Sequence, residues 1–240
     1  MKYKQVIICT LGLLVGMTQP VLGEFEIPTK TRTGNRADAG NRGPNAPPPK
    51  LCLQMGKPLL ALVPQSNFGY TLASHPTFWL YIPGYSKSID FTLIDDNTGD
   101  KVYQTNFNVE SEQGIISLKL PSVAPPLKVG KQYRWVFVFD CGDGAEDLSV
   151  DVVVERVAAS NSLTSQLNSA ATMMEKIDIY AENGLWHETI TELGNLRRSN
   201  PDDVAIASRW NSLWQQDYIR FPDYDLTLEQ IQDCCDVSDR

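Results

Sequence analysis

Apolar and polar residues alternate along the chain between Cys52 and about Ala158, which is the period of a strand with one buried face. The alternation is clearest within Ile89–Asp95 and within Ile115–Leu120. Turn formers such as Pro83-Gly84 separate the apolar segments. The pattern predicts seven strands, at Leu59–Pro64, Thr77–Ile82, Ile89–Asp95, Val102–Val109, Ile115–Leu120, Gln132–Asp140 and Leu148–Val157.

Seven short strands with turn residues between them, within about 110 residues, predict an antiparallel β-sandwich over residues 52–158. The sixth strand should be covered on both sides, since Val136 and Val138 stand between its aromatic residues. The stretch Leu127–Trp135 resembles the corner that enters the sixth strand of fibronectin type III-like domains. The resemblance implies that the Tyr133 hydroxyl bonds back to the backbone and that Trp79 belongs to the core.

Near Ala159 the apolar period changes to 3.6, which predicts a small helical cap over residues 159–217. Gly184 should end a first helix, and Asn200 followed by Pro201 should cap and begin a later one. The helical hairpin resembles a single tetratricopeptide repeat and departs from it at Thr189, where that family has a small residue. One repeat cannot bury its own apolar face, so we expect it to dock on the sandwich. The matching positions are Ile177, Tyr180, Gly184, Trp186, Leu193, Leu196 and Pro201.

Residues 1–23 have the three parts of a signal peptide: Lys2 and Lys4, the apolar run Val6–Met17, and Val21-Leu22-Gly23 before the cleavage point. The alternative is an uncleaved anchor. Cleavage predicts an exported protein, periplasmic or extracellular, with no transmembrane segment in its mature chain. Residues 24–51 are rich in turn formers and predict a disordered linker, and residues 218–240 predict a solvated acidic tail.

The acidic balance limits the partners. Loss of Lys2 and Lys4 with the leader takes the formal net charge from −8 to −10, which argues against nucleic acid and anionic membrane surfaces. We expect the partner to be another envelope protein.

Four cysteines remain after the leader, and an oxidising compartment would favour their pairing. Alternating strand directions put the start of the first strand and the end of the sixth at one pole, so a disulfide between Cys52 and Cys141 is geometrically reasonable. Three interpretations of Cys234 and Cys235 stay open: pairing with another chain, a free dithiol, or an incidental feature.

No catalytic signature is present, and no cofactor or metal is expected. His75 and His187 lack zinc-ligand spacing, and hydrogen-bonded structural roles are the simpler interpretation. Two acidic turns faintly suggest calcium loops but are explained by turn chemistry. An aromatic set on the cap is either core or an interaction patch. The residues concerned are Asp95, Asn97, Gly99 and Asp100, then Asp143, Glu146 and Asp147, and for the aromatic set Trp186, Trp210, Trp214, Tyr218 and Phe221.

An ordered set of motifs over about residues 52–215 resembles the cyanobacterial family of domain of unknown function 928, which implies no assigned activity. The leading hypothesis is therefore a non-enzymatic binding or structural module of the cell envelope. The alternatives are an accessory subunit of a secretion or sensor complex, acting through the hairpin, and a hydrolase whose carboxylates meet only in the folded chain. The motifs are Leu60–Pro64, Ser74–Trp79, Gly114–Leu118, Ala124–Leu127 and Tyr180–Trp186.

Overall fold

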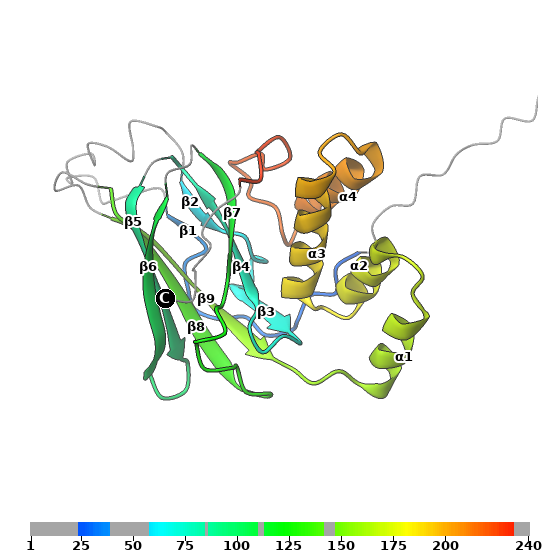
Figure 1. The fold of residues 1–240 in the computed structure, drawn as a ribbon, viewed down its shortest axis with the longest axis horizontal. Coiled ribbons are helices and arrows are strands. Elements are labelled where there is room, and N and C mark those ends of the chain that lie inside the picture. Colours follow the sequence, from blue (N-terminus) through cyan, green and yellow to red (C-terminus); the bar gives the residue numbers. More distant parts are fainter. Residues whose placement is uncertain (1–23, 39–57, 85, 110–112, 142–146, 233–240) are drawn as a thin grey trace, which may run out of the picture.

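The computed structural model describes residues 24–38, 58–84, 86–109, 113–141 and 147–232, which form three layers (Figure 1). Sheets of five and four strands make a β-sandwich, and four helices that follow in the chain pack beside the smaller sheet. The order of a β-sandwich followed by a helical cap is as the sequence predicts.

All seven predicted strands are present, with ends shifted by a few residues, and two further strands join them. The five-stranded sheet has the order β3-β9-β8-β5-β6, and the four-stranded sheet has the order β1-β2-β4-β7. The strands are β1 (Ala37–Asp38), β2 (Leu59–Ala61), β3 (Phe68–Thr71), β4 (Thr77–Ile82), β5 (Ser86–Asp95), β6 (Lys101–Val109), β7 (Gly114–Lys119), β8 (Gln132–Phe139) and β9 (Leu148–Arg156).

The expectation of a wholly antiparallel sandwich is wrong at one edge. β3 pairs with β9 in parallel, with Phe68 opposite Val153 and Thr71 opposite Arg156. A four-residue strand that contains Gly69 offers too few positions for an alternation to be recognised. Its backbone pairing with β9 places it in the sheet, and no local sequence pattern reports that pairing.

Aromatic rings fill the space between the two sheets. The ring centroid of Phe78 on β4 lies 4.9 Å from that of Trp135 on β8, and Phe91 on β5 lies 4.9 Å from Phe137. The prediction that β8 is covered on both sides is wrong: its residues alternate between buried and half-buried, and Val136 and Val138 on the outer face stay half-exposed. Branched apolar residues tolerate a partly wet sheet face, so they do not require a covering layer.

The corner before β8 has the predicted form. The backbone N–H of Lys128 donates to the Tyr133 hydroxyl at 3.1 Å, and Tyr133 is buried. Gly130, with φ of 77°, makes the turn between them. The expectation for Tyr133 is therefore confirmed.

Four helices make up the third layer: α1 (Asn161–Ser169), α2 (Met173–Glu182), α3 (Trp186–Ser199) and α4 (Val204–Gln215). Gly184 ends α2 as predicted, with φ of 67°, and Leu185 N–H donates to the Tyr180 carbonyl. The expected start of the last helix is wrong. Asn200 caps the end of α3, and Asp203 caps α4, because its carboxylate accepts from two N–H groups of the first turn, those of Ala205 and Ile206.

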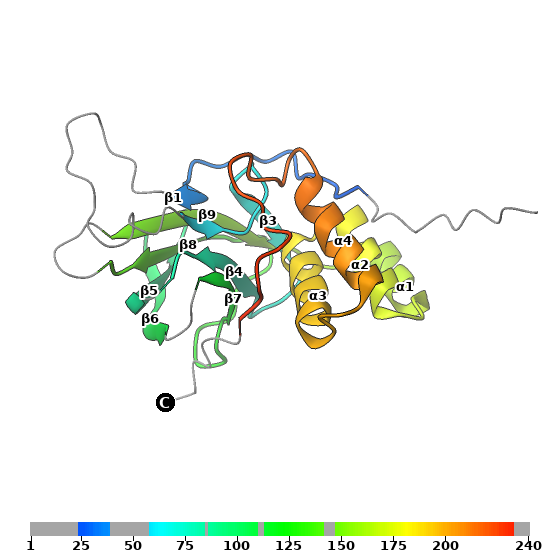
Figure 2. The same cartoon turned by 90° about the horizontal axis from the view of Figure 1, so that it is seen from above.

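The cap docks on the outer side of β4, with α3 against the sheet (Figure 2). Trp79 on β4 is buried there, and its indole N–H donates to the Thr191 hydroxyl of α3 at 3.1 Å. Trp79 is therefore core as predicted, but it belongs to the core between sheet and helices. The predicted docking of the hairpin on the sandwich is confirmed.

Residues 24–38 are packed, which corrects the expectation of a disordered linker for this part of residues 24–51. Phe25 is buried with its ring 5.2 Å from that of Trp186, and the backbone of Asn35 pairs with that of Asp151. Isolated apolar residues in a turn-rich stretch carry no period, so composition alone misses them. Residues 39–51 lie outside the described part, as does the predicted signal peptide.

The acidic segment after α4 is also packed as far as Gln232. Ile219, Phe221 and Leu226 are buried, and Ile231 forms a parallel bridge with Ile115 of β7. The prediction of a solvated tail is therefore wrong for residues 218–232. The charges that suggested it lie on the exposed positions between these apolar residues.

Candidate functional site

A pocket lies where α4 ends and the following segment folds back. Its volume is about 500 Å³. α4 stops at Gln215, and the N–H groups of Ile219 and Arg220 both donate to the Gln216 carbonyl, which turns the chain. The lining residues are Trp214, Gln215, Arg220, Phe221, Pro222, Asp223, Tyr224, Asp225, Leu226 and Thr227.

The rear wall of the pocket is fixed by Arg36, which comes from the N-terminal segment. Its guanidinium lies 3.9 Å from the Phe221 ring centroid and donates to the carbonyls of Val63, Ile219 and Arg220 at 2.6–2.9 Å. Burial lowers the pKa of Arg36 to about 10, so the group stays charged at neutral pH. One side chain thus joins both terminal segments to the sandwich and holds Phe221, which lines the pocket.

The pocket combines aromatic rings with hydrogen-bonding groups of both kinds. Trp214 and Tyr224 supply aromatic surface, and the buried indole N–H of Trp214 finds no hydrogen-bond partner among the described residues. Arg220 is a donor and Asp223 an acceptor, both exposed to solvent. Asp225 is committed elsewhere: it accepts from the N–H and hydroxyl of Thr227, which hold the pKa of Asp225 below its usual value.

Sequence interpretation missed this pocket because it assigned residues 218–240 to an acidic tail. A local signal existed, since Ile219, Phe221 and Leu226 recur among the acidic residues. Their spacing fits neither a strand nor a helix, so the signal has no period to recognise.

A second candidate lies where α3 meets the sandwich. Glu188 Oε1 accepts from the Thr71 hydroxyl at 2.7 Å and from the N–H groups of Leu72 and Ala73 at 2.8 and 3.2 Å. Its other oxygen is buried and finds no partner in the described part of the chain. Beside it, His187 Nδ1 lies 3.2 Å from the Thr77 carbonyl, so this nitrogen carries the proton and Nε2 is the unpartnered, buried one.

Burial controls the protonation of both groups. It lowers the pKa of His187 to about 4, and it raises the pKa of Glu188 despite the three hydrogen bonds that favour the carboxylate. The adjoining cavity has a volume of only about 100 Å³. Ligand sites are typically several times larger, about 300–1,000 Å³. We interpret the pair as a structural joint that ties α3 to the Thr71–Ala73 loop.

Among the described residues, the remaining candidates from the sequence do not come together as a site. His75 bonds the Ala124 carbonyl through Nε2 at 3.0 Å, which is the structural role expected. Asp95 accepts from the N–H of Asn97 and is ion-paired with Lys131, so the first acidic turn joins β5 to β6 without an open carboxylate at Asp95. In the described residues, no three His, Cys, Asp or Glu side chains come close enough to hold a metal ion. Asp143 and Glu146 of the second acidic turn lie outside them.

Only one of the two cysteines in the predicted disulfide lies in the described part of the chain. Cys141 is buried at the end of β8, and Cys52, Cys234 and Cys235 lie outside the described residues. The start of β2 and the end of β8 lie at the same pole of the sandwich, as predicted. Asp38 pairs with Leu59 at the start of β2, and its carboxylate accepts from the N–H of Ser149, which lies beside the end of β8. The Cys52–Cys141 disulfide stays a prediction.

The aromatic set on the cap is largely core. Trp186 donates from its indole to the Leu62 carbonyl at 2.9 Å, and Trp210 meets Trp214 edge to face at 5.3 Å. These three rings and Phe221 are buried, whereas Tyr218 is 53% exposed. The set therefore holds the cap to the sandwich. Within the described residues, no helix is both long and apolar enough to cross a membrane.

The chain is similar to a solved structure and to one family model. Among solved structures, the chain is similar to the crystal structure of a DUF3244 family protein with an immunoglobulin-like β-sandwich fold from Bacteroides vulgatus, at 14% identity and a TM-score of 0.23. That match covers 35% of this chain and 84% of the other. The comparison with curated proteins finds no match. The model of the family described as Domain of Unknown Function (DUF928) matches residues 37–220, more than half of the chain, and the chain therefore belongs to that family.

Proposed function

We propose that this protein is an exported, non-enzymatic binding module of the cell envelope that holds a neutral saccharide in the pocket between Trp214 and Tyr224. The observation that carries the proposal is the composition of the pocket. Three aromatic side chains, those of Trp214, Phe221 and Tyr224, share a volume of about 500 Å³ with amide, guanidinium, carboxylate and hydroxyl groups. This volume lies in the range of about 300–1,000 Å³ that small-ligand sites occupy.

The mixture of groups suits a sugar better than an ion or an apolar molecule. Each sugar hydroxyl both donates and accepts, so a lining with donors and acceptors side by side satisfies it. Arg220, which is ion-paired with Asp217, supplies donors, and the carboxylates of Asp223 and Asp225 supply acceptors. The apolar C–H face of the sugar ring would lie on Tyr224, which is half-exposed and combines an apolar ring with a polar edge.

Binding without catalysis is supported by the state of the carboxylates in the pocket. A glycosidase needs one carboxyl group that stays protonated near neutral pH to act as general acid. The pKa of Asp225 is shifted the other way, below its usual value, because Thr227 donates to it. Burial raises the pKa of two carboxylates, and neither lines this pocket: Glu188 belongs to the separate, much smaller cavity, and Asp178 is ion-paired with Arg209.

The test is calorimetric titration of the mature protein with soluble envelope saccharides, including peptidoglycan-derived disaccharides and neutral oligosaccharides. We expect micromolar to millimolar binding by one of them, together with a change in Trp fluorescence from Trp214. Tyr224→Ala should weaken binding at least tenfold. The matched control, Tyr218→Ala, removes an exposed tyrosine that does not line the pocket and should leave binding unchanged.

Two outcomes would contradict the proposal. Absence of binding across the saccharide panel, or equal binding by the Tyr224→Ala variant, would rule out the pocket as a saccharide site. Hydrolysis of any bound saccharide by the wild-type protein would show that the module is an enzyme after all.

A further inference from the structure

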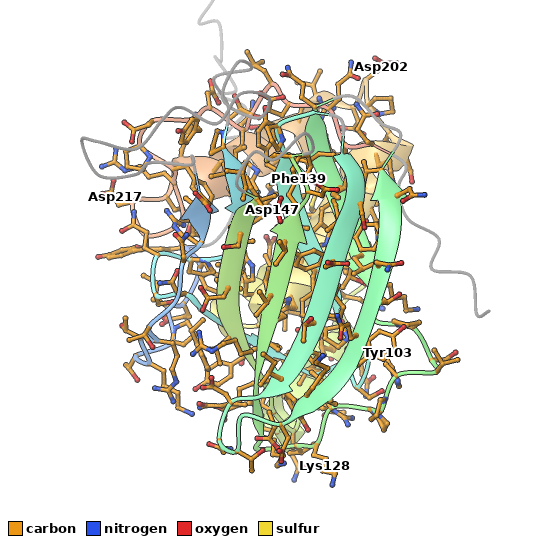
Figure 3. All side chains as sticks on the ribbon, turned by 90° about the vertical axis from the view of Figure 1, so that its left-hand side faces the viewer. Tyr103, Lys128, Phe139, Asp147, Asp202 and Asp217 are labelled. Atoms are coloured by element: carbon orange, nitrogen blue, oxygen red, sulfur yellow. The ribbon has the colours of Figure 1, made fainter. Side chains whose placement is uncertain are left out.

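β6 forms one edge of the five-stranded sheet. It pairs with β5 along one side, and no other strand in the described part of the chain lies against its second side. Figure 3 shows this sheet face-on, with β6 and Tyr103 at its right-hand margin. Every second residue of β6 therefore directs its backbone N–H and C=O away from the sheet.

Proteins usually protect such an edge with charges, proline, short strands or a covering segment. The other edges of this sandwich follow that rule. β3 has four residues and lies against α3, so that a Cβ on Gly69 would stand 3.1 Å from His187 Nε2. β7 is covered at its start, where Ile115 exchanges backbone hydrogen bonds of 2.8 and 2.7 Å with Gln230 and Gln232.

In the described part of the chain, β6 lacks most of these protections, and Lys101 at its start is its single charged residue. From Val102 to Val109 its sequence is Val-Tyr-Gln-Thr-Asn-Phe-Asn-Val, without a charged residue, proline or glycine. Its ladder with β5 shifts register near each end, but Tyr103–Phe107 pairs regularly with Ile89–Leu93. The strand thus offers a regular five-residue edge, centred on Thr105, that is open to another strand.

The two faces of this edge differ in chemistry. Tyr103, Thr105 and Phe107 lie on the core side, opposite buried Leu93, Phe91 and Ile89, and remain half-exposed because the sheet ends there. Gln104 and Asn106 lie on the outer side and are exposed.

A second copy of the same strand fits this edge. In an antiparallel pair related by a two-fold axis through Thr105, Tyr103 lies opposite Phe107 of the partner subunit, and Gln104 lies opposite Asn106 of the partner subunit. Aromatic residues then meet on the core side and amides meet on the outer side, which are favourable cross-strand pairs. The register also keeps the core side of both sheets on one face, as a continuous sheet requires.

The β6 edge carries little of the charge by which two copies of this chain repel each other. The chain carries a formal net charge of −8, so two copies repel over most of their surfaces. The single charged residue of β6, Lys101, lies opposite Val109 of the partner subunit in this register, so no like charges meet in the ladder. We propose that the protein forms a two-fold symmetric dimer through antiparallel pairing of β6 with β6, which joins the two five-stranded sheets into one.

The experiment is analytical ultracentrifugation of the mature protein, residues 24–240, over a range of concentrations. We expect a monomer–dimer equilibrium with a dissociation constant in the micromolar range. The double variant Gln104→Lys/Asn106→Lys places lysines opposite each other twice across the two-fold axis and should weaken the dimer about tenfold or more. Both positions are exposed in the monomer, so circular dichroism should show an unchanged fold.

The matched variant Gln104→Glu/Asn106→Lys changes the same two positions but places each lysine opposite a glutamate, and its lysine lies opposite Asp90 of β5 within the monomer. It should dimerise at least as well as the wild-type protein. A wild-type protein that stays monomeric at all concentrations would overturn the proposal. Equal dimerisation by the first double variant, or loss of the dimer in both variants, would overturn it as well. None of these outcomes depends on saccharide binding.

Discussion

The six-membered ring of the Trp79 indole lies directly against Gly194 of α3. A Cβ on Gly194 would stand 2.8 Å from Cζ2 and from Cζ3 of that ring. Glycine inside a helix costs about 1 kcal/mol relative to alanine. Here the absence of a side chain allows the helical layer to approach β4 closely enough to bury Trp79.

We expect Gly194→Ala to destabilise the protein by about 1–3 kcal/mol, because the added methyl group overpacks the contact with Trp79. Urea denaturation, followed by circular dichroism, measures the change in the free energy of unfolding. In a Trp79→Phe background the smaller ring leaves room, so the same substitution should cost much less. An equal cost in both backgrounds would show that Trp79 is not the limiting contact.

The Tyr133 corner should contribute to stability through its hydroxyl group. Tyr133→Phe leaves the backbone N–H of Lys128 without its acceptor, and we expect a loss of about 1–2 kcal/mol. Tyr218→Phe is the control, since that side chain is exposed. Similar unfolding midpoints for the two variants in urea would show that the Tyr133 hydroxyl does not stabilise the fold.

Acid should weaken the joint between cap and sandwich. The pKa of His187 is about 4 in the folded chain, below the ordinary 6.5, so the unfolded state binds a proton first as the pH falls. The stabilisation from a neutral His187 is present above pH 6.5 and is lost between pH 6.5 and about 4, by roughly 3 kcal/mol at most. Glu188 acts in the opposite sense, because its raised pKa means that protonation relieves the buried charge.

The measurement is the free energy of unfolding in urea between pH 7.5 and pH 4. His187→Asn keeps a group that can donate to the Thr77 carbonyl but cannot take up a proton in this range. The variant should therefore lose less stability than the wild-type protein as the pH falls from 7 to 4. Parallel pH profiles for the two proteins would contradict the assignment.

The disulfide prediction calls for peptide mapping by mass spectrometry without reduction. We expect one linked pair of peptides that contains Cys52 and Cys141. Closing a loop of about 90 residues contributes roughly 4–5 kcal/mol in the chain-entropy model, so reduction should lower the urea midpoint markedly. Recovery of Cys141 linked to Cys234 or Cys235 would refute the pairing.

Much of the fold could be predicted because its signals are local. In β5, Ile89, Phe91 and Leu93 alternate with polar residues, and in the chain they form the buried face of a strand. The turn at Gly184 and the corner at Tyr133 depend on a few neighbouring residues, so both can be predicted from the sequence.

The sequence alone determined the order of a β-sandwich and a helical cap, because hydrophobic periods arise from the geometry of single strands and helices. The tertiary structure decided the parallel strand β3, the packing of both terminal segments, and the pocket beside Trp214. Each of these depends on residues far apart in the chain, such as Arg36 and Phe221, which meet only in the folded protein. No local pattern records such a contact, which is why the candidate site emerged only with the fold.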